Sequence, residues 1–101
     1  LTIPEDNFIR QANYKQFMAY KQLTKLIREK TQRKETIETK VLNLYEASNP
    51  SFYYVYEILG NYYAAIQQTD TAITYWQKAL TMPIAKQAEK VRIQQKINKK
   101  Q

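Results

Sequence analysis

Glycine occurs only once in this chain of 101 residues, and proline occurs three times. Tight β-hairpins and β-bulges depend on residues that adopt positive φ, glycine above all, so the turns of an all-β fold are nearly absent here. The chain also contains neither Cys nor His, which excludes disulfides, thiolate and imidazole catalysis, and the soft metal sites built from those side chains. We therefore predict an all-α fold, and we predict no cofactor and no metal site.

Apolar residues recur at helical spacing in five segments, which predicts five helices. The predicted helices span residues 8–30, about 37–47, 52–66, 69–81 and 84–98. Pro50 ends the second helix and Pro83 ends the fourth, because proline lacks an N–H group and disfavours helix at the residue before it. Polar segments at 31–34 and 67–70 make the other two breaks. We expect one domain over residues 1–101, in which residues 1–50 form a long helix and a second helix, 51–83 form a helical hairpin, and 84–101 form a basic final helix.

The apolar stripes indicate which side chains form the core. Phe8 and Ala12 begin the stripe of the first helix. The third predicted helix has six residues on its core side: Phe52, Val55, Tyr56, Leu59, Tyr63 and Ile66. Tyr53 and Tyr54 point away from that stripe, and Gly60 leaves room for the close approach of another backbone.

The segment 51–83 carries the strongest motif of the chain. Its members are separated by 3, 1, 3, 9, 4 and 3 residues, and they are Tyr56, Leu59, Gly60, Tyr63, Ala72, Trp76 and Ala79. This pattern resembles the tetratricopeptide repeat, although Pro83 comes one residue early and Gln67 replaces the usual turn glycine. The resemblance implies antiparallel helix pairs in a right-handed superhelix, with residues 1–50 as a degenerate earlier repeat and the last helix as a cap. An ordinary helical hairpin of a bundle is the alternative.

The resemblance also implies a protein-binding groove on the first helix of the hairpin. By position, its lining residues are Tyr54, Glu57, Asn61 and Ala64, followed by Ala65. Relatives that clamp the C-terminal carboxylate of chaperones carry a lysine where this chain has Glu57. Because the Glu57 carboxylate would repel such a ligand, that particular function is disfavoured.

The last helix has two apolar rows in the sequence. At 100° per residue, Ile93 and Ile97 fall opposite Ile84, Ala88 and Val91. If the longer row covers the repeat, then Ile93 and Ile97 face outward. We therefore predict a second apolar contact there, made with another copy of the chain as a homodimer, with a partner protein, or with an adjacent domain of a longer chain. A kink that turns the end of the helix toward its own domain is the alternative.

A weaker resemblance extends over the whole chain. The order of Pro4-Glu5-Asp6, Phe17-Met18-Ala19-Tyr20 and Asn49-Pro50-Ser51-Phe52-Tyr53, with a closing helix rich in Lys, Glu and Gln, is similar to the C-terminal helical tail of bacterial penicillin-acyltransferase-like Ntn hydrolases. That resemblance implies an accessory tail without catalytic residues, since the nucleophilic Cys of such enzymes has no counterpart here.

The charge and hydropathy patterns narrow the choice of function. The net charge is +7, and the positive excess is concentrated in 1–50 and 84–101. Since the cations of the last helix do not form one continuous basic face and no aromatic side chain accompanies them, nucleic-acid binding is disfavoured. No apolar run is long enough to span a membrane. No Glu/Asp pair on an apolar face and no Gly-rich phosphate loop occurs, so we expect a non-catalytic module for protein–protein or interdomain interaction. The compartment is not indicated.

Overall fold

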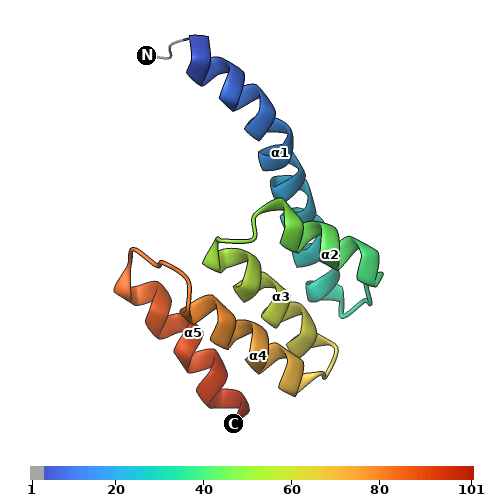
Figure 1. The fold of residues 1–101 in the computed structure, drawn as a ribbon. Helices are drawn as coiled ribbons and strands as arrows, with labels where there is room; N and C mark the ends of the chain where they lie inside the picture. The colour runs from blue at the N-terminus through green and yellow to red at the C-terminus, as the bar shows by residue number, and fades with distance from the viewer. Residues whose placement is uncertain (1–3) are drawn as a thin grey trace.

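The computed structural model describes residues 4–101, with side chains from Tyr14 onward (Figure 1). Five helices follow one another: α1 (Pro4–Arg33), α2 (Thr39–Ser48), α3 (Tyr53–Ala65), α4 (Thr69–Leu80) and α5 (Gln87–Lys100). No strand occurs within residues 4–101, and the prediction of an all-α fold is confirmed. The predicted core positions Phe8 and Ala12 lie outside the described side chains.

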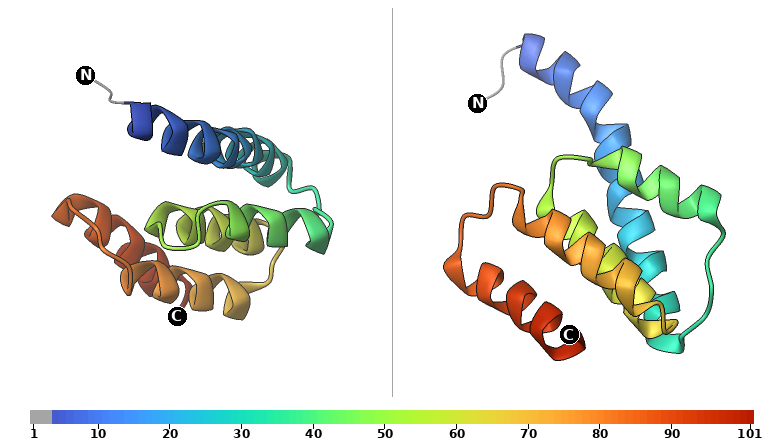
Figure 2. Two further views of the ribbon diagram at one scale, coloured as in Figure 1. Left: turned by 45° about the horizontal axis from the view of Figure 1, so that its top comes forward. Right: turned by 60° about the horizontal axis from the view of Figure 1, so that its bottom comes forward.

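The helices form two hairpins and a final single helix, with α3 in the centre. The α3–α4 pair has the most extensive packing, while α1 packs against α2 and α3, and α5 packs against α4. Figures 1 and 2 show α1 at one side of α3 and α5 at the other, and α1 continues well past the end of α2. Every second helix along the chain, that is α1, α3 and α5, therefore takes its place in order across the molecule, with α3 in the middle.

Both hairpins turn through a residue other than glycine in the left-handed region. Lys34 follows α1 with φ 57°, and Gln67 lies just after α3 with φ 68°. The backbone closes each turn in the same manner, because Glu35 N donates to Lys30 O at 3.0 Å and Gln68 N donates to Tyr63 O at 2.9 Å. These are the carbonyl-capping bonds with which helices end before a left-handed residue.

Gly60 is required by the indole ring of Trp76. A Cβ atom at residue 60 would overlap Cδ1 and Nε1 of that ring. The sequence correctly indicated a close approach at Gly60, but the neighbour is the side chain of Trp76 rather than a backbone. Ala72 and Ala79 on α4 have no exposed surface, so small residues bring α3 and α4 together as expected.

The core contains more of α3 than its predicted stripe. Val55, Tyr56 and Leu59 are buried, as predicted, and so are Tyr53, Ile58 and Tyr62. The prediction was wrong for Tyr53, whose hydroxyl donates to Glu89 Oε1 of α5 at 2.5 Å. It was also wrong for Phe52, which lies outside the helix and is exposed, while Tyr63 and Ile66 are half-buried. A central helix with neighbours on several sides buries more than one stripe.

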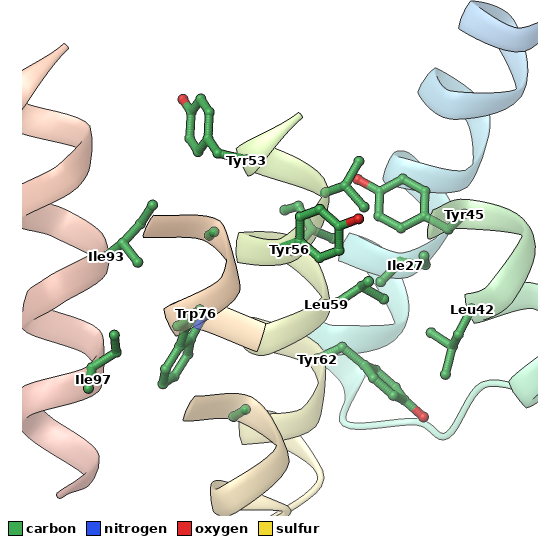
Figure 3. Close-up of a cluster of buried hydrophobic side chains, with 14 residues drawn as sticks. Ile27, Leu42, Tyr45, Tyr53, Tyr56, Leu59, Tyr62, Trp76, Ile93 and Ile97 are labelled. Atoms are coloured by element: carbon green, nitrogen blue, oxygen red, sulfur yellow. The ribbon is translucent and has the colours of Figure 1, made fainter. Parts of the chain in front are cut away.

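The orientation of α5 contradicts the sequence prediction. Ile93 and Ile97 are buried in the core of their own chain, whereas Ala88 and Val91 are exposed. Figure 3 shows both isoleucines pointing from α5 toward Trp76 of α4. The prediction failed because α5 begins at Gln87, so Ile84 belongs to the preceding loop and does not define the phase of the helix. The prediction that Ile93 and Ile97 contact a second copy or a partner was therefore wrong, because both side chains are buried within their own chain.

Candidate interaction site

A hollow of about 320 Å³ lies where α1, α3 and α5 meet, and we call it the cationic hollow. Its lining comes from all three helices: Arg28, Thr31 and Gln32 of α1; Tyr54, Glu57, Ile58 and Asn61 of α3; Arg92 and Lys96 of α5. Three cations and one carboxylate therefore surround it. Helices far apart in the sequence supply these residues, so the hollow depends on the fold as a whole.

The floor of the cationic hollow is fixed by the carboxylate of Glu57, of which only 2% is exposed. Arg92 donates to it through Nε at 2.8 Å and through Nη2 at 2.6 Å, and Lys96 Nζ donates at 2.7 Å. The arginine thus binds the carboxylate with two parallel bonds, the geometry that makes such pairs strong and directional. Glu57 therefore connects α3 to α5, because both of its hydrogen-bond donors, Arg92 and Lys96, belong to α5.

Asn61 extends the same network to α4. Its Oδ1 accepts hydrogen bonds from Lys96 Nζ at 3.0 Å and from Trp76 Nε1 at 3.2 Å. Among the described residues, no buried side-chain nitrogen or oxygen lacks a hydrogen-bond partner. Satisfied buried networks of this kind fix one arrangement of the helices around them.

The network shifts the ionisation of its members in the direction that its geometry dictates. Burial opposes the charged form of Glu57, but the hydrogen bonds from Arg92 and Lys96 outweigh it, and the pKa of Glu57 is lowered. The Glu57 hydrogen bond in turn raises the pKa of Arg92. Burial, together with the hydrogen bond to Glu89, raises the pKa of Tyr53 to about 12. At neutral pH, Glu57 is a carboxylate held between two cations.

The structure brings together only part of the predicted site. Tyr54, Glu57 and Asn61 line the cationic hollow, whereas Ala64 is half-buried and does not line it. Ile93 and Ile97 lie in the core beneath α5 and are unavailable to a partner. Glu57 is not a free negative charge facing a ligand, because its carboxylate is already occupied.

Sequence reasoning missed the cations from the two flanking helices. These cations are Arg28 of α1 and Arg92 and Lys96 of α5, and none of them was predicted from the sequence as a candidate site residue. The signal that would have placed α5 is a spacing of 34 residues: Leu59 and Tyr63 repeat as Ile93 and Ile97. In a repeat of that period, those two isoleucines take packing positions, and Arg92 and Lys96 then face the neighbouring helix.

A second hollow adjoins the first along α1. Its volume is about 330 Å³, and it shares Arg28 and Gln32 with the cationic hollow. Lys21 and Lys25 extend the positive charge along α1, and Glu29 is the carboxylate on this side. The adjoining hollow therefore continues the charge of the cationic hollow toward Tyr20.

The chemistry of the site is that of binding by cations and hydrogen-bond donors. Within the described residues, no group of three or more Cys, His, Asp or Glu is arranged to hold a metal ion. In the same part of the chain, no helix combines the length and the apolar character needed to cross a bilayer.

Comparisons with protein-family models, with curated proteins and with solved structures gave no match.

Proposed function

We propose that this chain is a non-catalytic interaction module of tetratricopeptide type, which binds a segment of a partner protein, or of an adjacent domain, across α1, α3 and α5. The observation that carries the proposal is the cationic hollow itself, lined by the alternate helices α1, α3 and α5. The repeat-like spacing of Tyr56 to Ala79 and the recurrence of Leu59 and Tyr63 as Ile93 and Ile97 support it. Tyr54 and Asn61 are the contact residues of α3.

The direct test is selection of binders from a library of random peptides, followed by measurement of their affinity for groove variants. Tyr54→Ala removes a half-buried aromatic contact from the lining, and Gln32→Trp places a large ring into the hollow from an exposed position on α1. We expect both changes to weaken selected peptides at least tenfold. Lys40→Ala, on an exposed position of α2 outside the hollow, is the matched control and should leave affinity unchanged.

Two results would count against this function. The first is that no selected peptide binds with an affinity better than millimolar. The second is that neither Tyr54→Ala nor Gln32→Trp changes the affinity of the selected peptides. Circular dichroism of each variant would show that the fold survives the substitutions.

The accessory tail of an Ntn-type hydrolase remains the alternative hypothesis. It differs from the first proposal in the occupant of the surface, which would be a catalytic domain of the same polypeptide. Adding such a domain in trans, if the gene encodes one, and finding that it competes with the selected peptides would favour the alternative.

A further inference from the structure

Two rows of cations border α3, one on each side. Lys21, Lys25 and Arg28 follow one another at spacings of four and three residues along α1, so they share one face of that helix. Arg92 and Lys96 form the second row on α5. Tyr54 and Asn61 of α3 lie between the rows.

The α1 row is available for a ligand. Lys21, Lys25 and Arg28 are all exposed, and within residues 14–101 the structure places no carboxylate within ion-pair distance of Arg28. The α5 row is available in part, because the side chain of Arg92 remains 45% exposed and that of Lys96 29% exposed while both hold Glu57. Two cations share the single charge of Glu57, which leaves a positive excess on this side as well.

From this arrangement we propose that the surface between the two rows binds an extended acidic peptide segment through its Asp or Glu side chains. The inference rests on the proposed function and specifies its ligand. Side chains of an extended segment alternate between two sides, and those on the same side recur every ~6.6–6.8 Å. Side chains one helical turn apart recur at about 5–6 Å between Cβ atoms. Acidic residues on one side of the segment therefore match the α1 row, and those on the other side match the α5 row.

A nucleic acid fits the same surface less well. Single-stranded nucleic acids are held by cations together with exposed aromatic rings on which successive bases stack. Here the two aromatic residues that line the hollows, Tyr20 and Tyr54, are half-buried, and the carboxylates of Glu29 and Glu57 lie among the cations. A peptide with separated carboxylates avoids those two acidic positions more readily than a continuous phosphate backbone does.

The test uses nonapeptides with an acetylated N-terminus and an amidated C-terminus, so that side chains supply every charge. One peptide carries Glu at consecutive positions along its middle five residues, and its control carries Gln at the same positions. Fluorescence anisotropy at low and at physiological salt should show the acidic peptide binding at least tenfold more tightly than its control. Raising the salt should reduce that difference.

Variants locate the binding on the protein. Lys25→Gln combined with Arg28→Gln should weaken the acidic peptide at least fivefold, because it removes two exposed cations of the α1 row. Lys40→Gln combined with Lys86→Gln removes the same charge from exposed positions that line neither hollow described above, and it should change affinity less than twofold.

Each alternative outcome has a distinct meaning. Equal affinity of the two peptides, or equal loss in the two double variants, would overturn the inference. Tighter binding of an oligothymidylate that depends on Lys25 and Arg28 would assign the surface to nucleic acid instead. If neutral peptides selected from the library need Tyr54 while the acidic peptide does not bind, the proposed function stands and the acidic ligand is wrong. If no peptide of any kind binds, the proposed function itself is wrong.

Discussion

The two helical hairpins of this protein have the same arrangement but hold together by different chemistry. In the α3–α4 hairpin, Gly60 and two alanines let the helices approach until the Trp76 ring fills the space above Gly60. In the α1–α2 hairpin, Tyr20 and Tyr45 stack at 5.9 Å, and the Thr24 and Tyr45 hydroxyls hydrogen-bond at 2.8 Å. Aromatic stacking occurs in both hairpins, because Tyr63 of α3 and Tyr75 of α4 also stack, at 5.4 Å. What distinguishes the α3–α4 hairpin is the close approach at Gly60, and what distinguishes the α1–α2 hairpin is the hydroxyl pair of Thr24 and Tyr45.

This difference determines which substitutions each helix–helix contact can tolerate. A pair of helices closed by small residues has no room for an added methyl group. A pair that buries a tyrosine hydroxyl needs a hydrogen-bond partner for that polar atom. Substitutions in the two hairpins should therefore fail for different reasons.

The largest effect is expected for Trp76→Ala. Trp76 is buried between α3, α4 and α5, and removing a buried Trp side chain costs about 3–5 kcal/mol. Tyr20→Ala, in the other hairpin, removes a half-buried ring and should cost less. Urea unfolding followed by circular dichroism checks both; equal losses would erase the proposed contrast between the hairpins.

Gly60→Ala should come next, with a loss of about 1–3 kcal/mol from overpacking against the indole ring. The loss should shrink when Trp76 is already replaced by Leu, because the overlapping ring is then gone. A double-mutant cycle measures that coupling. A stable Gly60→Ala variant in the wild-type background would show that the ring can move away.

The contact of α5 with the second hairpin should make stability depend on pH. The lowered pKa of Glu57 means that its stabilisation is fully present above the pKa of an unfolded Glu, about 4.3, and is lost as the pH falls through the folded value. Glu57→Gln should cost about 1–2 kcal/mol at pH 7, since Arg92 is partly exposed, and its deficit should narrow below about pH 4. A deficit that is constant from pH 7 to pH 3 would contradict this account.

Tyr45→Phe probes the first hairpin with the smallest change in shape. The ring and its stacking with Tyr20 remain, but the hydrogen bond to Thr24 is lost, which should cost about 1 kcal/mol. Tyr56→Phe is the comparison in the second hairpin, where the hydroxyl donates to Pro50 O at 2.6 Å. Thermal unfolding of both variants would show whether hydroxyls matter in each hairpin.

The smallest effect should be a gain. Lys34→Gly and Gln67→Gly each relieve a left-handed residue, and each should raise stability by up to about 1 kcal/mol after the greater entropy of the unfolded glycine is included. Because both hairpins turn in the same way, the two gains should be similar. A loss at either position would mean that the side chain contributes to the folded turn.

The sequence predicted the existence and order of all five helices, because strong helical periodicity and the prolines at 50 and 83 are local signals. The sequence also indicated a close approach at Gly60, although not its neighbour Trp76, and the tetratricopeptide resemblance indicated that Tyr54, Glu57 and Asn61 share one face of α3. These features are set within one helix or one hairpin.

What the sequence did not predict is how α5 faces the rest of the protein. Its inner side is half polar, with Glu89, Arg92 and Lys96 bonded to α3 beside Ile93 and Ile97. A helix whose inner side combines charged residues with isoleucines has a weak apolar stripe, so the periodicity indicated the wrong row. The cationic hollow was missed for the same reason, since two of its cations depend on that orientation.

The unequal lengths of α1 and α2 have a mechanical consequence. α1 has 30 residues and α2 has 10, so most of the N-terminal half of α1 extends past its hairpin partner. At ~1.5 Å per residue, Pro4 lies ~35 Å from Ile27, the buried residue that anchors α1 in the core. A tilt of about 10° at Ile27 would displace the far end by about 6 Å, taking the same rise per residue. A change in the tilt of α1 near Arg28, beside the cationic hollow, would therefore be amplified at the N-terminal end of the helix.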